Sequence, residues 1–396
     1  MSENGQQKSG KHLTLCVFID ALGWEILQRH AFLDDVLVHK QPLDTIFGYS
    51  STCDPTILTG KMPREHGHFA FFAYDPKNSP FRWYKLFTVL PKFLMERGRV
   101  RAKFSQIMKK VHGFTGYFQL YNMPFKTLHL FNYTEQKNIF EKGGINGGQE
   151  TVFDYLRDNN IPYCRSETYV ESDCVDEMAE EAAKGNIAFG YLFLGRLDAL
   201  LHQYGTDAKE VSDHIAWYEQ SLRRVYEAAA GTYDTVHVFV FSDHGMTDIS
   251  GVCDVMARVD GVGLKFGEDY AAAYDSTMAR FWFLKPGARE KIVAALEEEP
   301  LGHIMSDEEL AGYGCDFPGQ TYGELFFLMN PGILICPSHM GVKPLAGMHG
   351  FAPEDKDSTA SFMANIPVEP APRRLEDLYT LMRDDIAAGR GENPCS

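Results

Sequence analysis

Short apolar runs that alternate with amphipathic segments are the feature that most constrains the fold of this chain. Residues 13–20 (LTLCVFID) and 186–195 (NIAFGYLFLG) are apolar, and each is followed by a segment with helical spacing of its apolar residues. Residues 235–245 (TVHVFVFSDHG) are a third such run, and 324–337 predict two further strands joined by a turn. This alternation predicts an α/β protein whose central sheet carries helices on both faces.

Two stretches interrupt this alternation. Residues 69–150 begin with seven aromatic side chains in 69–84, and 82–110 carry nine Lys or Arg residues against one acid. We expect this stretch to be an insertion or cap over the sheet edge, and 251–323 to be a second cap element. The chain, 396 residues long, is then one catalytic domain spanning 1–396 with insertions, with two domains as the alternative.

Composition and charge exclude several classes of protein. The formal net charge of −16 argues against binding of nucleic-acid polymers, which normally requires a basic face. Eight scattered cysteines without a Cys-x-x-Cys pair favour reduced thiols over a disulfide framework or a cysteine zinc site. The polar N-terminus lacks the features of a secretory leader, and no apolar run has the length of a membrane span. We therefore expect a soluble, cytoplasmic protein.

Four elements with acidic or imidazole side chains stand out. They are Asp20 at a predicted strand end, the pair Asp198 and His202 in the helical segment after the second strand, the pair Asp243 and His244 at the end of the third, and His349 in the Gly-rich segment GMHGF. Taken singly, each has an ordinary structural explanation: a strand-end Asp is commonly a turn residue, and an Asp-x-x-x-His pair commonly lies on a helix surface. Taken together, three of these elements follow buried strands, where ligands bind in an α/β sheet. Because Asp198 and His202 are four residues apart, they share one helix face, and carboxylate and imidazole are ligands for Zn²⁺ and Mn²⁺.

Residues 50–67 (SSTCDPTILTGKMPREHG) raise a separate question, because three hydroxyl side chains stand together in them. Ser50, Ser51 and Thr52 form either a hydroxyl-rich turn that caps a helix over 53–60, or a group in which one hydroxyl is a nucleophile. A serine hydroxyl becomes a competent nucleophile when a divalent cation lowers its pKa.

Five segments of the chain resemble the alkaline phosphatase superfamily, most closely its type I phosphodiesterase/nucleotide pyrophosphatase branch. The segments are VFIDALGW (17–24), SSTCDPTILTGKMPREHG (50–67), YLFLGRLDALLHQYG (191–205), VFSDHGM (240–246) and GMHGF (347–351). They occur in the order of the family and cover about half of the chain. The resemblance implies an alkaline-phosphatase-like central sheet with helices on both faces and cap insertions.

The resemblance also implies two divalent metal ions, with Zn²⁺ expected before Mn²⁺. One ion would be held by Asp198, His202 and His349. The other would be held by Asp20, Asp243, His244 and the oxygen of the nucleophile. In the family the nucleophile precedes the Thr of a Thr-Gly pair by nine residues, which here selects Ser50, with Ser51 and Thr52 as its rivals.

Three departures from the family pattern bear on the substrate. The nucleotide pyrophosphatases typically carry Thr at the nucleophile position, where this chain has Ser50. Phe71 stands where that branch often has a phosphate-binding Asn, which weakens the expectation of a nucleotide substrate. Asp54 stands where a sulfatase would need Arg, and a carboxylate there would repel sulfate, so we reject sulfatase activity.

These features predict a metal-dependent hydrolase that cleaves a phosphodiester or phosphoanhydride of a small organic or nucleotide-like molecule through a phosphoseryl-type intermediate. The alternative is a phosphomonoesterase or phosphonate hydrolase on the same bimetallic site. A non-catalytic binding module is disfavoured, because all six metal-ligand positions outside the nucleophile are filled. The basic stretch 82–110 would hold a second phosphate, contact an anionic membrane surface, or simply be a packed cap. Residues 275–283 predict a strand whose Arg280 faces solvent or substrate.

Overall fold

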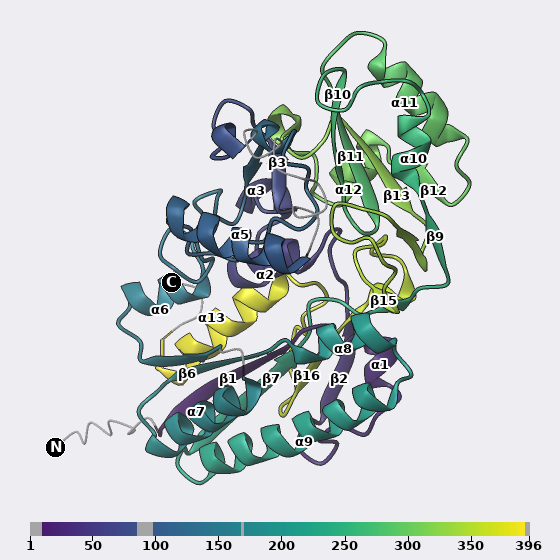
Figure 1. Ribbon diagram of the computed structural model, residues 1–396. Helices are drawn as coiled ribbons and strands as arrows, with labels where there is room; N and C mark the ends of the chain where they lie inside the picture. Colours follow the sequence, from purple (N-terminus) through teal and green to yellow (C-terminus); the bar gives the residue numbers. More distant parts are fainter. Residues whose placement is uncertain (1–9, 85–97, 168–169, 393–396) are drawn as a thin grey trace, which may run out of the picture.

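A six-stranded sheet forms the centre of the computed structural model, which describes residues 10–84, 98–167 and 170–392 (Figure 1). The strand order is β2-β16-β7-β1-β6-β5. The strands are β1 (His12–Ile19), β2 (His39–Leu43), β5 (Tyr163–Ser166), β6 (Phe189–Leu194), β7 (Thr235–Phe241) and β16 (Ala360–Ala364). The pairs β5–β6, β6–β1 and β1–β7 are parallel, whereas β16 is antiparallel to both of its neighbours. The mostly parallel sheet confirms the predicted fold class.

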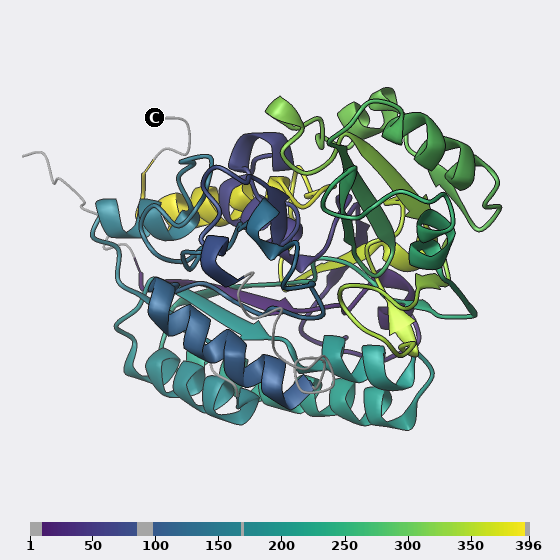
Figure 2. The same ribbon diagram turned by 45° about the horizontal axis from the view of Figure 1, so that its top comes forward.

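Helices cover both faces of this sheet, as Figures 1 and 2 show. On one face, Leu13, Leu15 and Val17 of β1 pack with α7 (Glu171–Lys184) and α9 (Lys209–Ala230). On the other face lie α2 (Ser50–Thr59), α6 (Val152–Asp158) and α13 (Asp377–Gly389), which share a second apolar cluster with Cys16 and Phe18. Because both faces are buried, β1 is apolar at nearly every position rather than at alternate ones.

A second, antiparallel sheet of four strands lies beside the first in the order β10-β11-β13-β12. Its strands are β10 (Tyr270–Tyr274), β11 (Met278–Phe283), β12 (Gly302–Ile304) and β13 (Leu325–Met329), and its helices are α10 (Val255–Asp260), α11 (Ala288–Glu297) and α12 (Asp307–Gly312). Residues 251–323 therefore supply three of its strands. Residues 324–337 form two strands, as predicted, but these strands do not belong to the central α/β sheet, and that part of the prediction is wrong. β13 pairs with β11 and β12, and β14 (Ile333–Ile335) pairs with β9 (Gly251–Cys253). An apolar run predicts a buried strand but does not select the sheet in which it pairs.

Arg280 of β11 is fully buried, contrary to the expectation that it faces solvent or substrate. Its Nε donates to Oδ2 of Asp275 at 2.8 Å, and its Nη1 donates to the carbonyl oxygens of Phe72 and Tyr322. The guanidinium therefore joins the second sheet to the segment 69–150.

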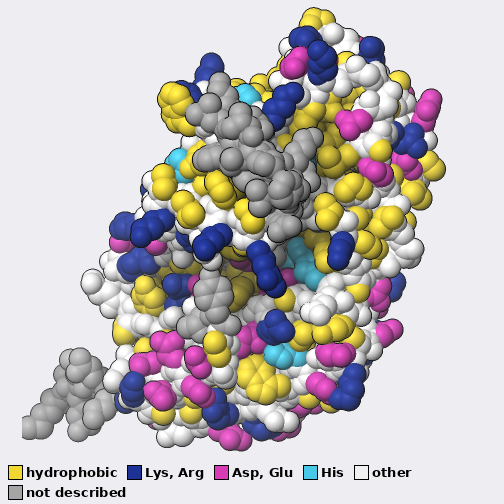
Figure 3. Space-filling view, in the orientation of Figure 1, with side chains coloured by type: hydrophobic (Ala, Val, Ile, Leu, Met, Phe, Trp, Pro, Cys, Tyr) yellow, Lys and Arg dark blue, Asp and Glu magenta, His cyan; other side chains and the backbone are white. Residues whose placement is uncertain are grey.

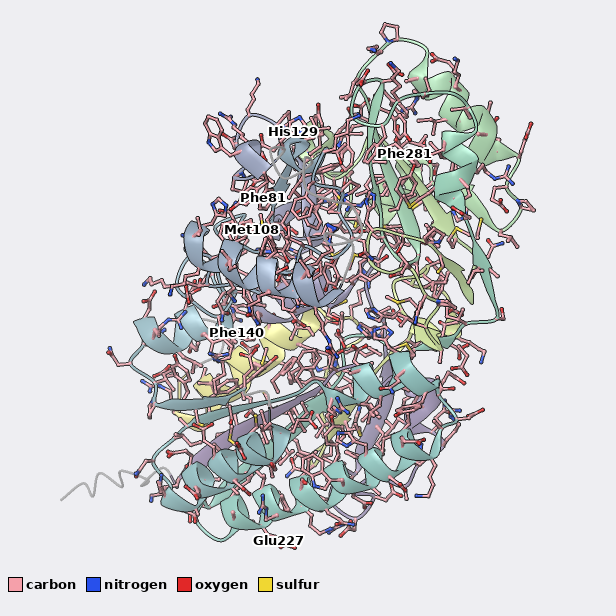
Figure 4. All side chains as sticks on the ribbon, viewed as in Figure 1. Phe81, Met108, His129, Phe140, Glu227 and Phe281 are labelled. Atoms are coloured by element: carbon pink, nitrogen blue, oxygen red, sulfur yellow. The ribbon has the colours of Figure 1, made fainter. Side chains whose placement is uncertain are left out.

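The aromatic side chains of 69–150 form the core of their own layer. The antiparallel pair of strands β3 (Phe72–Tyr74) and β4 (Phe131–Tyr133) packs with the loop residues around Phe118, with α5 (Gly98–His112) and with Trp282 of the second sheet. In Figure 4, Phe81 and Met108 lie in this layer, Phe281 lies in the second sheet, and Glu227 of α9 lies at the opposite side of the molecule. Most of these rings are packing residues. Part of the basic stretch 82–110, namely 85–97, lies outside the described residues.

Short elements complete the fold. They are α1 (Trp24–Leu27), α3 (Pro63–His66), α8 (Arg196–Tyr204), β8 (Thr247–Asp248), β15 (Gly347–Met348), and the 3-10 helices η2 (Leu128–Leu130), η3 (Pro318–Gln320) and η4 (Lys356–Ser358). Seven cysteines lie in the described part of the chain, and none of them forms a disulfide there. No helix of the described ranges is long and apolar enough to cross a membrane.

Candidate metal centre and its pocket

The candidate site lies at the carboxyl ends of the parallel strands β1, β6 and β7. Asp20 directly follows β1, and Asp243 and His244 follow β7 within three residues. After β6, the chain turns at Gly195 into α8, which carries Asp198 and His202 on one face. Parallel strands end at the same edge of a sheet, so these side chains converge although they come from distant parts of the sequence.

Asp20, Asp243 and His244 form one group, in which the ligand atoms all lie within 4.8 Å of one another. Nε2 of His244 is 3.0 Å from Oδ2 of Asp243 and 3.7 Å from Oδ1 of Asp20. The backbone N–H of Ala21 donates to the other oxygen of Asp243 at 3.2 Å. All three side chains are buried.

Asp198, His202 and His349 form the second group, within the same 4.8 Å limit. Oδ1 of Asp198 is 3.2 Å from Nε2 of His202 and 3.7 Å from Nε2 of His349. The two groups adjoin, because the rings of His244 and His349 stack with centroids 3.6 Å apart and planes 11° from parallel.

Backbone carbonyls orient two of the imidazoles. Nδ1 of His202 donates to the carbonyl of Gly347 at 2.8 Å, and Nδ1 of His244 donates to the carbonyl of Gly245 at 2.8 Å. Because Nδ1 carries the proton in each ring, Nε2 is the atom left to bind an ion. This is how metal-binding histidines are commonly fixed in one tautomer.

Burial and crowding of like charges dominate the electrostatics of the site. Burial raises the pKa of Asp20, and the neighbouring Asp243 and Asp198 raise it further. Burial also raises the pKa of Asp198. The pKa of His349 is lowered by burial and by the neighbouring charges of His244 and His202. Burial alone would lower the pKa of His244, but the interaction with Asp243 outweighs burial, so the pKa of His244 is raised.

Several buried polar atoms of the two groups have no hydrogen-bond partner among the described residues. They are Asp20 Oδ1, Asp198 Oδ1, Asp243 Oδ2 and His349 Nδ1. Buried polar atoms without partners are costly, and three carboxylates held together without cations are costlier still. Oxygen and imidazole donors in this arrangement suit divalent cations, so the residues present fit the two metal ions that the sequence resemblance implies.

The three hydroxyls of 50–52 differ in what they contact. Oγ of Ser50 lies 3.1 Å from Nε2 of His244, beside the first group. Oγ of Ser51 and Oγ1 of Thr52 instead donate to the carbonyl of Phe69, at 3.2 Å and 2.6 Å. The helix expected over 53–60 begins at Ser50, with Tyr49 as its N-cap, so the three residues form its first turn rather than a turn before it. Of the three, only Ser50 has its hydroxyl beside the candidate ligands.

A cavity of about 480 Å³ opens from the two groups. Its walls include Asp20, Ser50, Asp198, His202 and His349, as well as residues from the segment 69–150 and from the second sheet. Figure 3 shows histidine side chains within a hollow between the upper and lower parts of the molecule. Phe140, labelled in Figure 4, lies on the wall towards the central sheet.

The cavity includes residues that the sequence analysis did not single out. Tyr117, Tyr121 and Glu135 lie in the segment 69–150, outside every family-like motif, and no spacing in the sequence marks them. Phe71 and Asp54 also line the cavity. Phe71 stands where the nucleotide pyrophosphatases often have Asn, and Asp54 stands where a sulfatase would need Arg.

Comparison with known proteins agrees with this geometry. The family described as type I phosphodiesterase / nucleotide pyrophosphatase matches residues 14–304. No curated protein sequence matches the chain significantly.

Solved structures of mammalian proteins share the fold. Human ectonucleotide pyrophosphatase/phosphodiesterase 5 aligns over 94% of both chains with a TM-score of 0.66 and 16% identity. The murine protein aligns over 94% of both chains with a TM-score of 0.66 and 16% identity. Its inactive variant in complex with AMP aligns over 95% of both chains with a TM-score of 0.67 and 15% identity. At these identities the likeness establishes the fold, which is that of the alkaline-phosphatase-like phosphodiesterases.

Proposed function

Because the chain belongs to the type I phosphodiesterase / nucleotide pyrophosphatase family, we propose that it is a metal-dependent hydrolase with Ser50 as its nucleophile. Its substrate is a phosphodiester or phosphoanhydride of a small organic or nucleotide-like molecule. The observation that carries the proposal is the convergence of two ligand groups and the Ser50 hydroxyl at one edge of the central sheet.

Two divalent cations, Zn²⁺ before Mn²⁺, would occupy the ligand groups. Asp198, His202 and His349 would hold one ion, and Asp20, Asp243, His244 and Ser50 Oγ the other. When bound, such ions lower the pKa of a coordinated hydroxyl and offset the charge of the phosphate.

The protein's own groups then carry the reaction. Ser50 Oγ forms a bond to phosphorus while the bond from phosphorus to the leaving oxygen breaks, which gives a phosphoseryl-type ester. Water then attacks the phosphorus and restores the Ser50 hydroxyl. The first turn of α2, which begins at Ser50, directs the positive end of a ten-residue helix towards the bound phosphate.

The cavity, about 480 Å³ in volume, has room for a phosphate that bears a sizeable organic group, in a diester or in a monoester. The AMP complex of the murine relative supports a phosphate that bears an organic group. The rates of hydrolysis of bis-p-nitrophenyl phosphate and p-nitrophenyl phosphate would decide between a phosphodiesterase and a phosphomonoesterase. Faster hydrolysis of the diester supports the proposal, and faster hydrolysis of the monoester favours the phosphatase alternative.

Substitution of the nucleophile tests the mechanism. Ser50→Ala should lower diester hydrolysis by about a thousandfold or more, because no other hydroxyl of the first turn faces the ligands. Ser51→Ala is the matched control, since it removes a hydroxyl from the same turn and should retain most of the activity. The assignment is wrong if Ser50→Ala keeps its activity and Ser51→Ala loses it.

A further inference from the structure

A third cluster of metal-ligand side chains lies at the opposite edge of the central sheet, where β1 and β7 begin. Its members are His12, His237 and Asp385, whose ligand atoms all lie within 4.8 Å of one another. His12 opens β1, His237 lies near the start of β7, and Asp385 belongs to α13, which packs on that face of the sheet. From His237 to Phe241, the last residue of β7, the strand extends about 13 Å. The cluster is therefore separate from the two groups at the carboxyl edge.

The carboxylate of Asp385 holds this cluster together. Its Oδ2 is 3.1 Å from Nε2 of His12, and its Oδ1 is 2.5 Å from Nδ1 of His237. Oδ2 also accepts a hydrogen bond from Thr14 at 2.6 Å. In the described part of the chain, Asp385 forms ion pairs with these two imidazoles and with no Lys or Arg. Positive charge at this carboxylate has to come from the rings themselves or from a bound cation.

Helix α13 is shaped to admit the ring of His12. Gly389 lies one turn after Asp385, and a Cβ at Gly389 would lie 2.2 Å from Cδ2 and 3.0 Å from Nε2 of His12. The backbone of Gly389 does not have the positive φ that would by itself favour glycine. Glycine is also among the least favourable residues in a helix. Its presence here is explained by the imidazole, which lies against the helix backbone and reaches Asp385.

The donor set of the cluster is that of a transition-metal site. One carboxylate and two imidazoles also make up the group of Asp198, His202 and His349. Such donors suit Zn²⁺ rather than Ca²⁺ or Mg²⁺, which prefer oxygen ligands.

An ion can also reach this cluster and fit within it. The side chains of His12, His237 and Asp385 are 12%, 24% and 10% exposed, so the cluster is open to solvent on one side. Ligand atoms around a tetrahedral zinc ion lie about 3.4 Å apart, so small rotations of the three side chains would close the cluster around one ion. Water would take the fourth position.

We propose that His12, His237 and Asp385 bind a third divalent transition-metal ion, Zn²⁺ in the first place. The ion ties α13 to the first residues of β1 and β7 and takes no part in hydrolysis. It replaces the hydrogen bonds between the two rings and Asp385, and each neutral ring keeps its proton on the other nitrogen. Because these bonds are given up, whereas buried atoms of the two other groups have no partner in the described residues, this site fills last.

Zinc content after equilibrium dialysis of the full-length protein tests the site. The wild type should bind one zinc ion per chain more than His237→Gln, which replaces one imidazole by an amide. Loss of a partner that only orients a ligand weakens metal binding 10- to 100-fold, so loss of the ligand itself should weaken it about a hundredfold or more. Zinc beyond two ions per chain should also raise the midpoint of thermal unfolding of the wild type but not of His237→Gln.

His303→Gln is the matched control, because His303 forms an isolated pair with Glu309 on the surface and should be dispensable for zinc binding. Equal zinc content in the wild type and a folded His237→Gln protein would overturn the proposal. If His237→Gln does not fold, anomalous diffraction at the zinc edge from zinc-saturated crystals of the wild type decides. A peak between His12, His237 and Asp385 supports the site, and its absence rejects it.

This inference and the proposed hydrolase fail separately. The test measures a difference of one ion between two proteins, so it does not depend on how the groups at the carboxyl edge behave. His237→Gln should hydrolyse diesters at the wild-type rate, because His237 lies at the far end of β7 from Asp243. Loss of hydrolysis in a folded His237→Gln protein would contradict the separation of this ion from the reaction.

Discussion

At the scale of single residues, orientation separates side chains that share a composition. Ser50, Ser51 and Thr52 are consecutive hydroxyl residues, yet only Ser50 points towards His244, while the other two donate to the carbonyl of Phe69. The difference follows from rotation about the axis of α2, because successive helical residues project about 100° apart. A sequence motif identifies the turn, but the hydrogen bonds of the folded chain determine which of the three hydroxyls remains available.

Arg280 gives a prediction about stability at this scale. Its guanidinium is buried with Asp275 as its one carboxylate partner among the described residues, so removal of Asp275 leaves an uncompensated buried charge. Asp275→Ala should lower the free energy of unfolding by about 3 kcal/mol, measured by urea denaturation. Asp213→Ala is the matched control, because Asp213 pairs with Lys209 on the surface and its loss should cost less than about 1 kcal/mol. Equal losses in the two variants would contradict the role given to the buried pair.

At the scale of elements, α13 shows how a helix is fixed to the sheet that supports the site. Leu378, Met382 and Ile386 recur at helical spacing and are buried against the second apolar cluster. At its C-terminal end, Asp385 accepts hydrogen bonds from Thr14 at 2.6 Å and contacts the rings of His12 and His237. This contact joins α13 to β1 and β7, the strands after which Asp20 and Asp243 follow.

The Asp385 contact makes stability depend on pH. Burial acts to raise the pKa of Asp385, but its hydrogen bonds with His12, His237 and Thr14 outweigh this and lower the pKa from 3.8 to about 2. Because the folded state favours the ionised form, the contribution is fully present above about pH 4 and is lost as the pH falls towards 2. The shift corresponds to about 2 kcal/mol.

Asp385→Asn should therefore be less stable than the wild type by about 2 kcal/mol at pH 6, and the difference should shrink below pH 4. Urea denaturation between pH 3 and pH 6 measures it. Asp384→Asn, which removes a half-exposed partner of Arg383 on the same helix, serves as the control and should show a small, nearly constant effect. A loss in Asp385→Asn that is the same at pH 3 and pH 6 would rule out this explanation.

At the scale of the whole molecule, the site lies where three layers meet. The carboxyl edge of the central sheet and α8 supply five of the candidate metal ligands, the loop after β15 supplies His349, α2 supplies Ser50, and the segment 69–150 with the second sheet closes the cavity.

The convergence of the five ligands at the sheet edge could be predicted from the sequence, because buried parallel strands place their terminal residues at one edge. The rest could not. Nothing local distinguishes β13 from a strand of the central sheet, and Tyr117 and Glu135 reach the cavity through loops whose course depends on packing. Arg280 was likewise unpredictable, because its partner Asp275 lies on a preceding turn that only the second sheet positions.

The most direct test of the account is the rate of bis-p-nitrophenyl phosphate hydrolysis during a zinc titration of metal-free protein. The two ligand groups predict that the chelated protein is inactive and that activity rises to a plateau near two zinc ions per chain. His349→Ala, which removes one ligand from the second group, should fail to reach that plateau. Full activity in the metal-free protein, dependent on Ser50, would contradict the claim that the edge of the central sheet is a bimetallic hydrolase site.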